Sequence, residues 1–237
     1  MAGLIGCISS CSSQNASSEI RTLETNHIVR SVIESSLTLG VELRGSMPQV
    51  QVFWGDLSTH ARYHSLLGLT TSLGQGCFRI EVDRSVPDWA FAGILAHETM
   101  HTLRPSLHDL YFEGLASSIY WWSVESVQAC SSSQVCCIPP GDRLCGAASQ
   151  NLRMYKSYTA GSPSTISSNM LRAIASRVGV REVMSMANYF SGSEIEINEW
   201  LHSLVAEDVA RHLIREWWPI LERTRKTWAP DLSLQSV

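Results

Sequence analysis

The residues best suited to chemistry lie in one five-residue run. Positions 97 to 101 read H-E-x-x-H, with His97, Glu98 and His101 as the fixed residues. In an α-helix the two imidazoles lie one turn apart, about 6 Å along the axis and on the same face, so both can reach one cation. Two histidines leave room for a third protein ligand and a water molecule, as in catalytic zinc sites. The run predicts metal-dependent hydrolysis with Glu98 as general base.

The third metal ligand must come from another segment. Glu113 is favoured, because the helix expected to carry it can fold back on the motif helix, and small residues after it allow close packing. His108 nearly fits the longer pattern H-E-x-x-H-x-x-G-x-x-H, but it comes one residue too late, and Arg104 occupies the glycine position. Asp109 would suit an aspartate-ligand variant. Glu113 therefore ranks first, ahead of His108 and Asp109.

A helix that begins after the cap Ser85 and runs to about Leu103 must position the motif. Its expected start signals are a capping Ser85, Pro87 in the first turn and the acidic Asp88 near the positive end of the dipole. Residues 89–96 carry no charge or strongly polar group, so this helix is suited to burial. Ionisable groups on a buried helix need a partner such as a metal ion. The alternative is a helix end near solvent where the three side chains pair with one another.

Other elements follow from apolar periodicity and turn signals. Short β-rich runs at 50–54 and 77–82 can pair in one small sheet that precedes the motif helix. Pro219 is expected to kink or divide the last helix. The pattern predicts an α+β fold with a mainly helical body. Besides the motif helix, the expected helices are 18–37, 106–122, 166–178, 180–190 and 205–225.

The motif and the segment F-E-G-L-A at 112–116 together resemble the gluzincin metallopeptidases, particularly a small bacterial branch with a W-L-x-E-G-L-A-like helix. The resemblance covers about residues 77–122. It implies a zincin-like domain, a Zn²⁺ ion held by His97, His101 and Glu113, and Glu98 as the base that activates water. It also implies a peptide or protein substrate, with the 77–82 strand lining the cleft. The gap from His101 to Glu113 is shorter than in the large gluzincins.

Gluzincins typically stabilise the oxyanion with a Tyr or His that follows the glutamate-bearing helix. Tyr155 and Tyr158 are the candidates here. We favour Tyr158 as a second catalytic residue, with a packing role as the alternative for either side chain.

Composition limits the partners and the number of domains. The 237 residues carry a net charge of -4, and the 18 lysines and arginines are spread along the chain, so we expect no nucleic-acid partner. No run approaches the roughly 20 apolar residues of a membrane span. The length and the 44% apolar content fit a single metallopeptidase domain over residues 19–237. Its C-terminal part, 166–228, is expected to be helical.

Seven cysteines are many for a cytosolic enzyme. Four of them fall in a loop at 130–145, around a Pro-Pro-Gly turn, which predicts disulfide bonds. A structural zinc knuckle is disfavoured, because the adjacent Cys136 and Cys137 do not give C-x-x-C spacing. Disulfides favour an extracytoplasmic location, either secreted, periplasmic or anchored at the cell envelope. The alternative is a cytoplasmic effector protease with reduced cysteines.

Residues 1–18 are expected to be a disordered leader or the remnant of a lipoprotein signal. Leu4 to Cys7 has the small and aliphatic pattern of a lipobox, which makes Cys7 a candidate lipid anchor. The basic start and the apolar run of a signal peptide are missing.

The sequence also allows an alternative function. A gluzincin-like protein that no longer cleaves peptides could serve as a zinc-stabilised binding protein. The intact Glu98 argues against this alternative, since a purely structural metal site has no use for a base.

Overall fold

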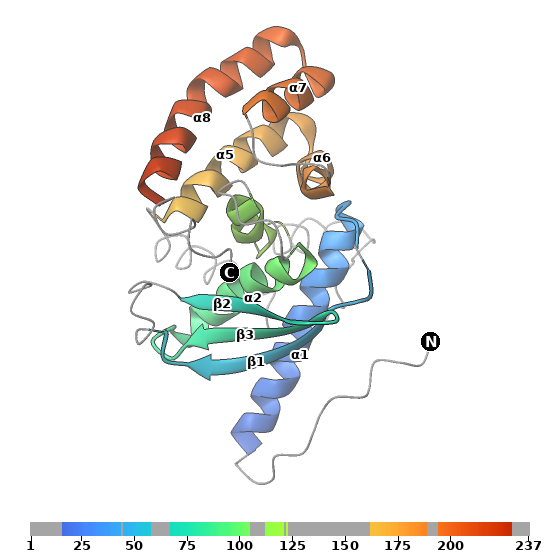
Figure 1. The fold of residues 1–237 in the computed structure, drawn as a ribbon, viewed down its shortest axis with the longest axis vertical. Coiled ribbons are helices and arrows are strands. Elements are labelled where there is room, and N and C mark those ends of the chain that lie inside the picture. The colour runs from blue at the N-terminus through green and yellow to red at the C-terminus, as the bar shows by residue number, and fades with distance from the viewer. Residues whose placement is uncertain are drawn as a thin grey trace, which may run out of the picture.

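A computed structural model describes residues 16–43, 45–57, 67–104, 112–120, 122, 162–188 and 194–228. These residues form a mainly helical body with one small sheet, so the α+β prediction is confirmed. Figure 1 shows α1 and α2 passing behind the sheet, with α5 to α8 gathered on the other side of α2. The cysteine loop, Cys7, His108, Asp109, Tyr155 and Tyr158 lie outside the described residues.

The sheet has the strand order β1-β3-β2. Strands β1 (Gln49–Gly55) and β3 (Cys77–Asp83) pair in parallel, which confirms the predicted pairing of 50–54 with 77–82. Strand β2 (Gly68–Gly74) runs antiparallel to β3 and was not predicted, because its sequence G-L-T-T-S-L-G has little apolar alternation. A turn with positive φ at Gly74, Gln75 and Gly76 joins β2 to β3. Glycine suits two of these three positions, since it has no Cβ to clash.

Strand β3 is the centre of the sheet and shows the expected alternation. Phe78, Ile80 and Val82 are buried, whereas Arg79 is exposed on the opposite face. Helix α2 contacts β2 and β3. The buried face of the sheet therefore supports the helix that carries the H-E-x-x-H motif.

Helix α2 (Asp88–Leu103) confirms the predicted motif helix, but the predicted cap is wrong. Pro87 occupies the N-cap position in extended geometry, without a side-chain cap hydrogen bond. Ser85 lies in the preceding turn, where its backbone N–H donates to Asp83 Oδ1 over 2.8 Å. Asp83 also accepts from the N–H of Leu57 over 2.6 Å, so its carboxylate organises this turn in place of a serine cap.

Helix α1 (Ala16–Thr38) begins two residues before the predicted Ser18, so the end of the proposed leader is helical. Part of the expected helix 106–122 is observed at 112–120 and 122. Two predicted ranges are confirmed by α5 (Pro163–Val178) and by α6 (Val180–Ser185), which a short 3-10 helix, Met186–Asn188, extends. Ser162 caps α5 by accepting from the N–H of Thr165 over 3.2 Å.

The C-terminal helices correct two expectations. Helix α7 (Glu194–Leu204) lies in the predicted helical part 166–228 but was not predicted as a separate helix, and α8 (Glu207–Trp228) continues through Pro219, which therefore does not divide it. Pro219 is exposed, while Leu213 and Trp218 on the same helix are buried. Tertiary packing of that apolar face offsets the hydrogen bond that the proline removes. None of the described helices combines the length and apolar character needed to cross a membrane.

Candidate metal centre

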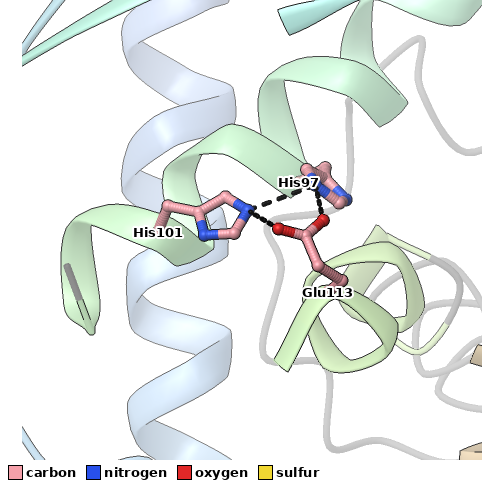
Figure 2. Close-up of side chains that lie close together, drawn as sticks. All are labelled: His97, His101 and Glu113. Atoms are coloured by element: carbon pink, nitrogen blue, oxygen red, sulfur yellow. Dashed lines mark hydrogen bonds and ion pairs between the residues drawn. The ribbon is translucent and has the colours of Figure 1, made fainter. Parts of the chain in front are cut away.

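Three predicted ligands come together at one point. Figure 2 shows His97 and His101 projecting from α2 toward Glu113, which lies on the helix through 112–120. The Nε2 atom of His97 lies 3.1 Å from Glu113 Oε2, and the Nε2 atom of His101 lies 3.4 Å from Glu113 Oε1. The two Nε2 atoms are 3.2 Å apart. The predicted set His97, His101 and Glu113 is thus brought within reach of one metal ion.

The spacing of these atoms fits a tetrahedral ion. Bonds of about 2.0–2.1 Å place the ligands of a tetrahedral site about 3.3 Å apart. The separation of 3.2 Å between the two Nε2 atoms agrees with that distance, and each Nε2 atom lies 3.1 or 3.4 Å from a different oxygen of Glu113. The side chains are also largely shielded, with exposed fractions of 14% for His97, 11% for His101 and 18% for Glu113. The group is therefore compact enough for one cation and retains some access to solvent.

Close packing places Glu113 opposite the histidines. A Cβ atom on the next residue, Gly114, would clash with Ser167 Oγ and lie only 2.8 Å from the carbonyl carbon of Ser167 in α5. Near this contact, Ser118 Oγ and Ser168 Oγ are 2.7 Å apart. The glycine thus lets the 112–120 helix approach α5 closely.

Neighbouring side chains orient the imidazoles. Ser117 Oγ lies 3.0 Å from His97 Nδ1, the ring nitrogen that faces away from Glu113. Phe112 contacts the His101 ring edge-on, with centroids 5.5 Å apart. Partners of this kind restrict the ring angle of metal-binding histidines. Ser117 was predicted as a small residue that allows close packing and not as a partner of His97, although its position four residues after Glu113 on a helix places both on one face.

Electrostatics favour a cation at this centre. Burial, the largest single effect, lowers the pKa of His97, but the hydrogen bond to Glu113 and the charges of Glu113 and Glu98 together raise it above the ordinary value. Unprotonated imidazole nitrogens and carboxylate oxygens are all electron-rich acceptors, so a positive charge between them is required to hold them this close together. Protons on the rings or a bound metal ion would provide it.

Glu98, the predicted base, is 7% exposed and lies beside the sheet. Thr70 Oγ1 in β2 lies 2.8 Å from Glu98 Oε2 and 2.8 Å from the Glu98 backbone oxygen. Gly68, two residues earlier, directly faces the Glu98 side chain. Neither β2 residue was predicted, because the strand itself was not recognised. Its turn-like composition left no signal for a contact with a helix 28 residues away.

The described residues contain no other cluster of three potential metal ligands. Comparisons of the chain with protein-family models, with curated proteins and with solved structures found no match.

Proposed function

We propose that the protein is a zinc-dependent peptidase of gluzincin type. The observation that carries the proposal is the convergence of two imidazoles and one carboxylate at separations of 3.1 to 3.4 Å, with a buried glutamate inside the same helical motif. A purely structural zinc site usually has four protein ligands. Among the described residues this group supplies three, which leaves one coordination position for water or substrate.

The donor set supports zinc as the metal. Two neutral imidazole nitrogens and one carboxylate oxygen match the His₂Glu set of zinc hydrolases. Bound zinc would lower the pKa of a coordinated water toward about 7 and polarise the substrate carbonyl. Glu98 would accept the proton of the attacking water and pass it to the leaving amine. Tyr158 remains our proposed oxyanion donor.

The position of the sheet supports a peptide substrate. Strand β2 lies at an edge of the three-stranded sheet and contacts the helix that carries the metal ligands. An extended peptide can add to such an edge through backbone hydrogen bonds. The 77–82 segment, expected to line the cleft, is the central strand β3, so the edge strand β2 takes that role in our proposal.

Metal content and peptide cleavage of purified variants test the function. Glu98→Gln should retain about one zinc per chain and lose nearly all cleavage of an unstructured peptide, because the base is gone but the ligands remain. Glu113→Ala should lose zinc and activity together. His212→Ala, which alters an exposed histidine of α8, is the matched control and should behave as wild type. Full activity in Glu98→Gln would contradict the mechanism, and zinc-loaded wild type without cleavage would favour the binding-protein alternative.

We further propose an extracytoplasmic location with disulfides in the 130–145 loop and a lipid on Cys7. The cysteine arrangement and the lipobox-like start of the sequence support this part of the proposal. Thiol titration of denatured protein isolated without reductant should find few free thiols. Seven titratable thiols would contradict it.

A further inference from the structure

Two residues of the edge strand β2 face the catalytic motif. Gly68 pairs with Val82, and Thr70 pairs with Ile80 on the neighbouring strand. Both partners are fully buried on the face of the sheet that packs against α2. Directly paired residues point to the same face. Gly68 and Thr70 are therefore directed at α2, whereas the next residue, Thr71, is exposed on the outer face.

The Glu98 side chain fills the space that a side chain at position 68 would need. A Cβ atom on Gly68 would lie 2.6 Å from Glu98 Cγ, 2.7 Å from Oε1 and 2.9 Å from Cδ. The backbone at Gly68 does not have positive φ, so an L-residue is compatible with its conformation. The absence of a side chain therefore has a local consequence, which is room for the glutamate.

Thr70 holds the same carboxylate through a hydrogen bond. Its hydroxyl has one hydrogen and lies 2.8 Å from two acceptors of Glu98, the backbone oxygen and Oε2. A hydroxyl can also accept a hydrogen bond. When Glu98 carries the proton of the attacking water, Oε2 can donate to Thr70 Oγ1, and the Thr70 hydrogen can turn to the backbone oxygen. The contact is thus compatible with both states of a general base.

We propose that Gly68 and Thr70 are positioning residues that fix the Glu98 carboxylate for catalysis, Gly68 by leaving space and Thr70 by hydrogen bonding. This inference rests on the proposed peptidase function. It assigns to the edge strand a role in orienting the base. Neither residue belongs to the set His97, His101 and Glu113, so the strand should act on turnover without acting on metal binding.

Variants of the two residues test the proposal in the full-length, zinc-loaded protein. Thr70→Val keeps the shape but removes the hydroxyl, and we expect kcat to fall about 10- to 100-fold with little change in KM. Thr70→Ser should restore most of the activity. Gly68→Ala should lower kcat by on the order of 100-fold or more, because the new methyl group displaces the carboxylate.

Two matched controls lie on the same sheet. Gln51→Ala changes an exposed residue of β1, the opposite edge strand, that pairs with Arg79 on the outer face. Gly55→Ala places a methyl group 3.4 Å from a different carboxylate, that of Glu81, which is an ordinary contact distance. Both controls should keep kcat within about twofold of wild type. Zinc content and the visible spectrum of the cobalt-substituted protein should be unchanged in every variant.

Crystal structures of metal-free Gly68→Ala and Thr70→Val provide a readout independent of activity. They should show the Glu98 side chain in a new rotamer, with His97, His101 and Glu113 in place. Full activity of both variants, or an unmoved Glu98, would overturn the proposal. If Gly68→Ala does not fold, the Thr70→Val and Thr70→Ser pair decides. If zinc-loaded wild type does not cleave peptides, the proposed function is wrong, and the structures still decide whether β2 positions Glu98.

Discussion

The partner of the His97 Nδ1 atom orients the imidazole ring and so sets the direction in which Nε2 faces a metal ion. Ser117 is this partner, at 3.0 Å. Removing an outer partner of a ligating histidine typically lowers metal affinity 10- to 100-fold. We expect Ser117→Ala to weaken zinc binding by about 10-fold, the low end of that range, because a serine is a weaker partner than a carboxylate.

Competition with a chromophoric chelator measures this change. Ser118→Ala is the control, since Ser118 contacts Ser168 and not His97. It should reduce stability while leaving zinc affinity near that of wild type. Equal zinc affinities for Ser117→Ala and wild type would show that Ser117 does not orient the ring.

His97 also makes the centre respond to pH, with opposite signs for the metal-free and metal-bound forms. Burial lowers its pKa, but Glu113 and Glu98 raise it by more, so the folded pKa lies above the ordinary value of 6.5. A raised folded pKa means that the protonated ring stabilises the metal-free fold fully below about pH 6.5. This stabilisation is lost as pH rises through the folded pKa.

Zinc binding requires the neutral ring and therefore strengthens over the same pH window. We expect the increase in Tm on adding zinc to be small near pH 5.5 and to grow steadily toward about pH 8. Differential scanning calorimetry with and without zinc measures it. The metal-free His97→Gln variant should lack the acid-side stabilisation. A zinc-induced shift that is the same at all these pH values would contradict the assignment.

At the scale of elements, the sequence predicts what depends on local periodicity. Helical spacing alone brings His97 and His101 together, and α2 and β3 have strong apolar patterns. Glu113 could be ranked first, but its meeting with the histidines depends on the packing of the 112–120 helix. Strand β2 could not be predicted, because its only buried residue is Gly68 and its polar side chains resemble a turn. The contact of Thr70 with Glu98 therefore depends on tertiary packing and could not be predicted from local sequence.

The close packing of the 112–120 helix against α5 determines where Glu113 lies in the metal centre. A methyl group on Gly114 would lie 2.8 Å from both the Cβ and the carbonyl carbon of Ser167, and backbone cannot move aside cheaply. We expect Gly114→Ala to lower the free energy of unfolding by about 1–3 kcal/mol. Zinc affinity should also fall, because Glu113 is carried on the displaced helix.

Urea denaturation of the metal-free protein and zinc titration measure the two effects. Ser167→Ala is the control on the α5 side of this contact. Ser167 Oγ is buried without a hydrogen-bond partner, so its removal should change stability little or increase it. If Gly114→Ala has the stability and zinc affinity of wild type, then close packing of the 112–120 helix against α5 is not required for either property.

At the scale of the whole molecule, the metal centre lies where two parts of the chain meet. Figure 1 shows the helix that follows α2 in sequence lying between α2 and α5. The histidines belong to the part that contains the sheet, while the Glu113 helix packs on the C-terminal helices through Gly114 and Ser118. A metal ion bound to all three ligands would therefore couple the two parts, and the coupling free energy would add to the stability of the fold.

A buried polar network also joins the same two parts. Arg104, directly after α2, donates through Nη2 to Asn188 Oδ1 over 2.6 Å and through Nε to the oxygen of Ala187 over 3.0 Å. Asn188 Oδ1 also accepts from the N–H of Glu42, and its Nδ2 donates to the oxygen of Gly40. One side chain thus connects the end of α2, the segment after α1 and the turn after α6.

Asn188→Ala would leave the buried Arg104 guanidinium and two backbone groups with one partner fewer each. Each buried polar group deprived of a partner costs roughly 1–3 kcal/mol. Because relaxation and water entry recover part of this, we expect a loss of about 3 kcal/mol in the free energy of unfolding, measured by urea denaturation. Asn169→Ala, an exposed asparagine on α5, should change it by less than about 0.5 kcal/mol. Since Asn188 is not one of the three proposed metal ligands, zinc affinity in the folded variant should stay near that of wild type. A stability equal to that of Asn169→Ala would mean that the two parts are held together by apolar packing without this network.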